Sequence, residues 1–103
     1  MMFRKLYWVT EMVDSAGASR VEGVYTSIPE LLRNGISCVD CEDRLRLTLA
    51  KLDSDKGPLG CWIEPKFDSL GDRLSEFVET DEFTEEHCHM LVDALKRRTA
   101  LAA

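Results

Sequence analysis

Apolar and polar residues alternate along two parts of the chain that resemble one another. In the first part, residues 5–13 are rich in aromatic and β-branched side chains, and a Ser-Ala-Gly turn leads into a similar segment at 20–26. In the second part, residues 45–52 are followed by an Asp/Ser/Lys/Gly turn and by residues 60–64. Alternation with a period of two is typical of a half-buried strand, and short turns join antiparallel neighbours. The pattern therefore predicts two β-hairpins.

Residues 41–52 fit two descriptions. Three leucines, Leu45, Leu47 and Leu49, alternate with polar or small residues, as in a strand. Two of these leucines also share one face of a helix with Cys41 and Leu52. We favour the strand, because the resemblance to the first half of the chain supplies it with a partner at 60–64.

A helix is expected after each hairpin. The first begins at Ser27, whose hydroxyl can accept from the amide of Glu30 in a capping box while the glutamate reaches back. It ends at Gly35, since glycine takes the left-handed cap conformation at little cost. The second begins after Asp68 or Ser69 and has apolar residues at helical spacing. Those residues are Leu70, Leu74, Phe77 and Val78.

The clearest helix signal lies near the end of the chain. Thr84 can cap this helix, Glu85 and Glu86 lie at the positive end of its dipole, and the basic residues 96–98 lie at its negative end. Residues 99–103 are expected to form a frayed tail. The main apolar face consists of Cys88, Leu91, Val92 and Leu95.

Together these elements predict an α+β fold. We expect a four-stranded antiparallel sheet, made of two β-hairpins each followed by a helix, with the helices packed on one face. The length of 103 residues is close to the commonest domain size, so residues 1–103 are expected to form one small domain. A chain of this length buries enough surface to fold without disulfides or metals.

The charge is distributed unevenly along the chain. Residues 1–52 hold seven acidic and seven basic residues, whereas residues 53–103 hold twelve acidic and six basic ones, so the net charge of −6 lies in the second half. Such a surface repels phosphate groups and anionic lipid headgroups. We therefore expect neither nucleic acid nor a membrane as a direct partner.

The expected cellular location depends on two signals that we do not find in the sequence, a membrane helix and a secretory signal. No apolar run approaches the ~20 residues of a membrane helix. The first five residues include two basic ones, but no long apolar segment or small-residue cleavage site follows. The four cysteines are then expected to be reduced thiols in the cytoplasm.

Cys38 and Cys41 form the one pattern that can signal a chemical site. Two thiols three residues apart can hold a zinc ion or cycle as a dithiol. The other candidate ligands are Cys61, His87, Cys88 and His89. The last three are consecutive, about 100° apart around a helix, and lack the tight pairing of a structural zinc site. We therefore favour no metal or other cofactor, and keep Cys38, Cys41, His87 and His89 as the alternative.

The last helix carries a second apolar stripe. His87, Met90, Ala94 and Leu101 lie on it, turned away from Leu95. A helix that is apolar on two faces usually buries both, and in so small a domain the second face most simply meets another copy or a partner protein. We therefore expect Met90, Ala94 and Leu101 to form a protein interface.

No standard catalytic pattern is present in the sequence: it has no Gly-x-Ser-x-Gly, His-Glu-x-x-His, phosphate-binding loop or dinucleotide fingerprint. The sequence therefore predicts a small, acidic, cytoplasmic interaction or regulatory module without its own catalysis, which self-associates as a homodimer. One alternative is a metal- or thiol-dependent module that uses Cys38 and Cys41. A second alternative is a small-ligand-binding domain with a pocket between sheet and helices near Trp8 and Trp62.

Overall fold

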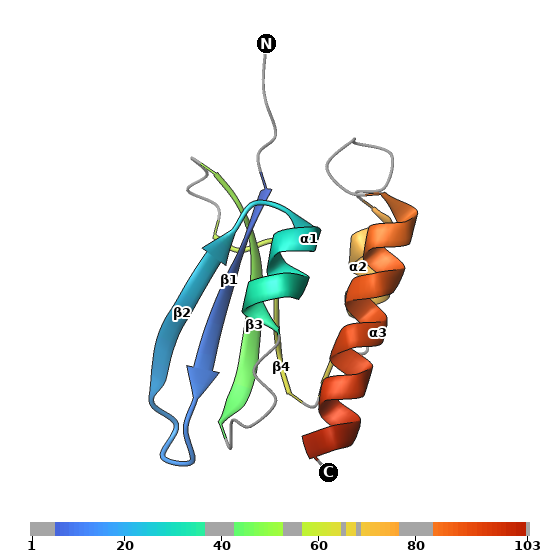
Figure 1. Cartoon of the computed structure of the whole chain (residues 1–103). Coiled ribbons are helices and arrows are strands. Elements are labelled where there is room, and N and C mark those ends of the chain that lie inside the picture. The colour runs from blue at the N-terminus through green and yellow to red at the C-terminus, as the bar shows by residue number, and fades with distance from the viewer. Residues whose placement is uncertain are drawn as a thin grey trace.

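The fold is built on one antiparallel sheet. The computed structural model describes residues 6–36, 43–52, 57–64, 66–67, 69–76 and 84–102, and of 99–102 only the backbone. Its strands are β1 (Leu6–Val13), β2 (Ser19–Tyr25), β3 (Arg44–Lys51) and β4 (Gly60–Ile63). Their order in the sheet is β2-β1-β3-β4, and all neighbouring pairs are antiparallel (Figure 1). Both predicted hairpins are confirmed, and they join through β1 and β3.

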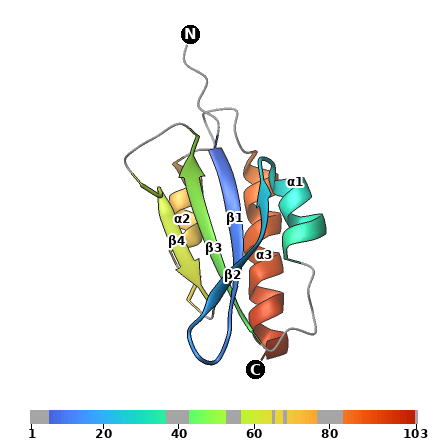
Figure 2. The same cartoon turned by 90° about the vertical axis from the view of Figure 1, so that its left-hand side faces the viewer.

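Helices cover one face of this sheet. After the first hairpin, α1 (Ile28–Glu30) continues as a π-helical turn, η1 (Leu31–Gly35). After the second hairpin come α2 (Leu70–Ser75) and α3 (Glu85–Ala102). Both views show these helices on the same side of the strands (Figures 1 and 2). The predicted α+β fold, with helices packed on one face, is confirmed.

The core lies between the sheet and the helices. Trp8 in β1 and Leu47 in β3 are 0% exposed, whereas the residues that follow them, Val9 and Thr48, are half-buried. Residues 44–51 therefore form the strand that their alternation favoured, because pairing with β1 along the whole strand places its leucines inside. The helices complete this core with Leu31, Leu70, Leu74, Leu91 and Leu95.

The capping box at the start of α1 forms only in part. Ser27 Oγ accepts a hydrogen bond from the backbone N–H of Glu30 at 3.3 Å, as expected. The carboxylate of Glu30 does not turn back to Ser27 but accepts from Arg33 at 2.9 Å and from Asn34 at 3.0 Å. The glutamate therefore ties the first turn of the helix to the next one.

Gly35 has a different role from the predicted one. Among the described glycines only Gly17 and Gly57 have a positive φ, so the prediction of a left-handed cap at Gly35 is wrong. A Cβ atom at position 35 would lie 2.8 Å from Leu31 Cδ1 and 2.9 Å from Tyr25 Cε2. Glycine is therefore required because the backbone of η1 approaches these two side chains closely.

The helix after the second hairpin begins where expected. α2 ends at Ser75, and Phe77 and Val78, which were expected to belong to the same helix, lie outside the described residues. Ser69 stands at the start of α2 without a side-chain cap. Its Oγ instead accepts a hydrogen bond from Trp62 Nε1 at 2.8 Å, which joins α2 to β4.

The last helix is longer than expected. Thr84 Oγ1 accepts from the backbone N–H of His87 at 3.1 Å, which confirms the cap, and Leu91 and Leu95 are 0% and 1% exposed. α3 continues to Ala102, so the basic residues 96–98 do not lie in its last turn, and fraying of 99–103 stays a prediction. None of the helices in the described part of the chain is long and apolar enough to cross a membrane.

Candidate functional site

The candidate thiol ligands are not brought together in the described residues. Cys38 and Cys41 lie outside those residues, so a site at this pair stays a prediction. Cys61 is exposed on β4, whereas Cys88 is buried in α3. Burial raises the pKa of the Cys88 thiol, and the negative charge of Glu85 raises it further. A thiol that stays protonated is a poor metal ligand and a poor nucleophile.

The two histidines both lie in the first part of α3. His87 is half-buried, and His89 is exposed, with its Nε2 atom 3.7 Å from Glu85 Oε1. The side chains of His89 and Glu85 are 75% and 80% exposed, so water weakens this pair. Within the described ranges, no group of three or more His, Cys, Asp or Glu side chains could hold a metal ion.

A hollow of about 360 Å³ lies between β4 and α2. Trp62 and Arg73 line it, but the Arg73 guanidinium is already engaged, since its Nε donates to the carbonyl of Leu59 at 3.0 Å and its Nη1 to Glu76 at 3.1 Å. Trp8 does not border this hollow, because it is 0% exposed in the core. Of the two tryptophans near the expected ligand pocket, only Trp62 borders this hollow, so a ligand site there stays a prediction.

The predicted interface on α3 is only partly exposed. Met90 is 47% exposed, whereas Ala94 is half-buried and packs against the core. The side chain of Leu101 lies outside the described part of the structure. An interface on this stripe therefore stays a prediction, and Met90 is its exposed member among the side chains described.

The face of the sheet opposite the helices carries an apolar patch, which we call the open sheet face. Strand register arranges its residues in three rows across the sheet. The first row is Val24, Val9, Thr48 and Cys61; the second is Val21, Glu11, Arg46 and Ile63; the third is Tyr7 and Ala50. Figure 2 is seen from this side, with the strands in front and the helices behind them.

Two valines on the edge strand are the most exposed part of this face. Val21 and Val24 are 61% and 59% exposed, more than any other large hydrophobic residue in the described ranges. Val9, next to Val24 on β1, is half-buried. A cluster of large aliphatic side chains on a surface marks a contact site more often than scattered single residues do.

The open sheet face is electrically balanced. Glu11 Oε2 lies 3.6 Å from Arg46 Nη1, and their side chains are 19% and 33% exposed. In the neighbouring row Thr48 Oγ1 donates to Cys61 Sγ at 3.4 Å. The two charged residues of the three rows thus pair with each other. A further charged residue, Arg44, lies outside these rows, in the next row along β3, opposite Val13.

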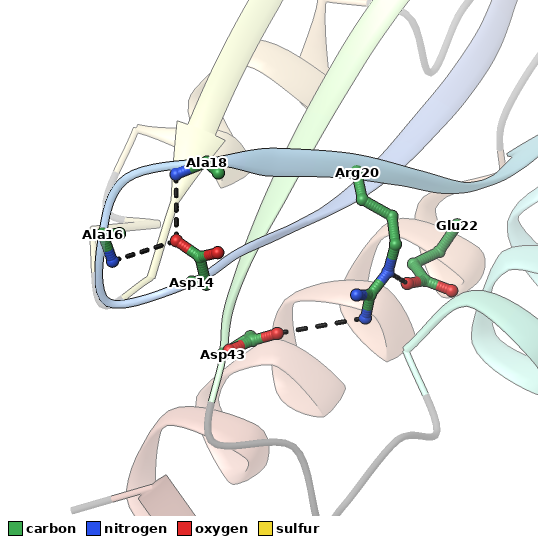
Figure 3. Close-up of polar contacts among 6 residues, drawn as sticks. All are labelled: Asp14, Ala16, Ala18, Arg20, Glu22 and Asp43. Atoms are coloured by element: carbon green, nitrogen blue, oxygen red, sulfur yellow. Dashed lines mark hydrogen bonds and ion pairs between the residues drawn. The ribbon is translucent and has the colours of Figure 1, made fainter.

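The free edge of β2 is polar and irregular. The register shifts between Thr10 and Glu11, which leaves Glu22 as an extra residue in β2. Arg20 Nε lies 2.5 Å from Glu22 Oε1, and its Nη2 lies 3.9 Å from Asp43 Oδ2 (Figure 3). The hydrogen bond and the charge of Glu22 raise the pKa of Arg20. Charged side chains and a bulge discourage pairing with a foreign strand, so this edge is a poor docking site.

The turn between β1 and β2 is held by one carboxylate. Asp14 Oδ1 accepts from the backbone N–H groups of Ala16 and Ala18, both at 2.9 Å (Figure 3). Gly17 supplies the positive φ of 87° within the turn. This turn fixes the register that brings Val21 and Val24 beside β1.

A buried ion pair connects α3 to the sheet. Glu64 Oε1 accepts from Arg98 Nε at 2.5 Å and from the backbone N–H of Leu45 at 2.8 Å. The backbone N–H of Glu64 in turn donates to the carbonyl of Leu45 at 2.9 Å. The carboxylate therefore continues the β3–β4 ladder past the end of β4. The side chains of Arg98 and Glu64 are 9% and 7% exposed.

Sequence reasoning found neither the open sheet face nor this ion pair. For the open sheet face a signal exists, because Tyr7, Trp8 and Val9 are apolar at consecutive positions, as in strands covered on both faces. For Glu64 and Arg98 we find no signal, since 34 positions separate them.

No protein-family model matches the chain, and neither does any curated protein or any solved structure. The function proposed below therefore rests on the chemistry of the surfaces described above.

Proposed function

We propose that this protein is a small interaction module without catalysis of its own, which acts by binding a protein through the open sheet face. The observation that carries the proposal is the exposure of Val21 and Val24, at 61% and 59%, beside the half-buried Val9. Burial of apolar surface drives most protein association at roughly 25 cal/mol per Å². Covering this face would therefore remove an unfavourable contact with water.

The chemistry of the described residues supports binding over catalysis. Burial raises the pKa of the Cys88 thiol, and the Arg73 guanidinium in the hollow is bonded to the protein itself. The free thiols of Cys61 and Cys88 fit a reducing compartment, so we place the protein in the cytoplasm. The net charge of −6 favours a protein partner over nucleic acid or an anionic membrane.

The experiment that tests this function compares capture by two charged variants. Immobilised wild type, Val24→Glu and Met90→Glu are exposed to lysate of the native cell, to which a differently tagged copy of the chain is added to about 1 mM so that a weakly bound copy is also captured. Val24 and Met90 are 59% and 47% exposed, so the same new charge is placed on two comparably exposed positions. We expect one or more proteins, the tagged copy included, to bind wild type and Met90→Glu but not Val24→Glu. Capture of no protein by wild type, or equal capture by all three, would overturn the proposal.

A further inference from the structure

We propose that the partner of the open sheet face is a second copy of this chain, packed face to face about a two-fold axis. This inference rests on the proposed function and names its partner and geometry. The axis would run parallel to the strands between β1 and β3, which are the central strands in the order β2-β1-β3-β4. Two sheets packed in this way lie ~10 Å apart and keep their strand directions within ~30° of each other.

The distribution of charge leaves the open sheet face free of net charge. Each chain carries a net charge of −6, so two copies repel one another wherever their acidic surfaces meet. In the three rows of the open sheet face, Glu11 and Arg46 balance each other. This neutral, apolar face therefore adds no repulsion of its own where two such acidic molecules meet. A strongly basic partner would instead be drawn to acidic positions such as Glu85 and Glu86 at the start of α3.

The rows of the face are complementary to themselves. A two-fold axis between β1 and β3 lays β1 over β3 of the second copy, and β2 over its β4. Glu11 then lies opposite Arg46 of the second copy, because the two residues share a row. In the same row Val21 lies opposite Ile63, so unlike charges face each other and apolar side chains face apolar ones.

The size of the face sets the expected affinity. The ten positions of the three rows, spaced ~4.8 Å across the strands and ~6.8 Å along them, give a flat footprint of roughly 330 Å² per copy. A standard interface buries about 800 Å² per partner, so this contact belongs to the small, reversible class. We expect a dissociation constant on the order of 10–100 µM.

Sedimentation velocity tests the inference at concentrations up to about 1 mM, roughly ten times the upper limit of that range. Four proteins are compared: wild type, Val24→Glu, Val24→Thr and Met90→Glu. Wild type and Met90→Glu should dimerise alike. Val24→Glu should raise the dissociation constant by at least about 30-fold, because it buries an unpaired carboxylate. Val24→Thr keeps the β-branch that suits a strand and should raise it about 5-fold through lost apolar area. Thermal melts establish which variants are folded. If Val24→Glu does not fold, the dissociation constant of Val24→Thr tests the inference in its place.

Several results would overturn the inference. If wild type remains a monomer at about 1 mM, a dimer of the expected affinity is excluded. The folded Val24 variants could dimerise as wild type does, or Met90→Glu alone could dissociate, which would assign self-association to α3. If wild type is a monomer but the lysate experiment still gives capture that depends on Val24, the proposed function survives and only the second copy is wrong.

Discussion

Replacing Glu64 by glutamine is expected to destabilise the protein far more than a surface Glu→Gln exchange. Glu64 Oε1 holds both Arg98 Nε, at 2.5 Å, and the backbone N–H of Leu45, at 2.8 Å. Glutamine keeps an oxygen that can accept from Leu45 but removes the negative charge. Arg98, whose side chain is 9% exposed, then loses its carboxylate in a place where water solvates it poorly.

The magnitude follows from burial of the pair. Removing one partner of a buried ion pair typically costs about 3–5 kcal/mol. Because the new glutamine side chain would keep the bond to Leu45, which is worth about 1 kcal/mol, we expect a loss of about 2–4 kcal/mol for Glu64→Gln. Arg98→Met keeps most of the aliphatic stem and should cost about the same. The double variant has no buried charge at this place and should lose less than about 2 kcal/mol.

The assay is a double-mutant cycle of unfolding free energies from urea titration. The matched control is Glu76→Gln, which removes the carboxylate from the exposed pair of Arg73 and Glu76, with side chains 40% and 58% exposed. It should cost less than about 1 kcal/mol. The coupling energy between positions 64 and 98 should be at least about 2 kcal/mol. Additive effects within about 0.5 kcal/mol, or a Glu64→Gln cost no larger than the control's, would refute the reasoning.

Three further predictions concern the core, the thiols and metal. Leu91→Ala should lower the free energy of unfolding, measured in urea, by about 2–5 kcal/mol, and Met90→Ala by less than about 0.5 kcal/mol, because the two side chains are 0% and 47% exposed. Equal losses would show that the wrong face of α3 has been assigned to the core. Burial, with the charge of Glu85, raises the pKa of the Cys88 thiol above its ordinary value. Above the pKa of the thiol in the unfolded chain, the unfolded state ionises while the folded state still holds its proton. The contribution of Cys88 to the free energy of unfolding is therefore complete below that pKa and falls as the pH rises beyond it. The melting temperature of wild type should therefore drop more steeply than that of Cys88→Ala above about pH 8.5, and parallel curves would contradict this. The purified protein should carry far less than one zinc ion per chain and keep its melting temperature in EDTA; stoichiometric zinc with loss of fold on chelation would support the site at Cys38 and Cys41 instead.

The sequence was a good guide wherever a local pattern determines the structure. The alternation of Leu45, Leu47 and Leu49 predicted β3 correctly, because one buried face leaves little choice of register. Thr84 was correctly predicted as a cap, since its bond to His87 spans three residues. These features depend on neighbours in the chain.

Features that depend on contacts between different elements were not predicted from the sequence. Gly35 was assigned a left-handed cap, but a Cβ atom there would meet the ring of Tyr25 at the end of β2, as well as the side chain of Leu31 within η1. Asp68 or Ser69 was expected to cap α2; Asp68 lies outside the described residues, and Ser69 Oγ accepts from Trp62 Nε1 instead. The open sheet face also becomes visible only when all strands are placed in register, because no single strand supplies more than three members of its rows.

The most direct test of the central claim is an isotope-filtered NOE experiment on a one-to-one mixture of labelled and unlabelled protein at a concentration where the dimer forms. The face-to-face arrangement predicts intermolecular NOEs between the methyl groups of Val21 and Ile63, which lie at the two ends of one row. It also predicts NOEs from Val24 to the β protons of Cys61 of the second copy. Intermolecular NOEs restricted to Met90 and its neighbours on α3, or none under these conditions, would contradict the account.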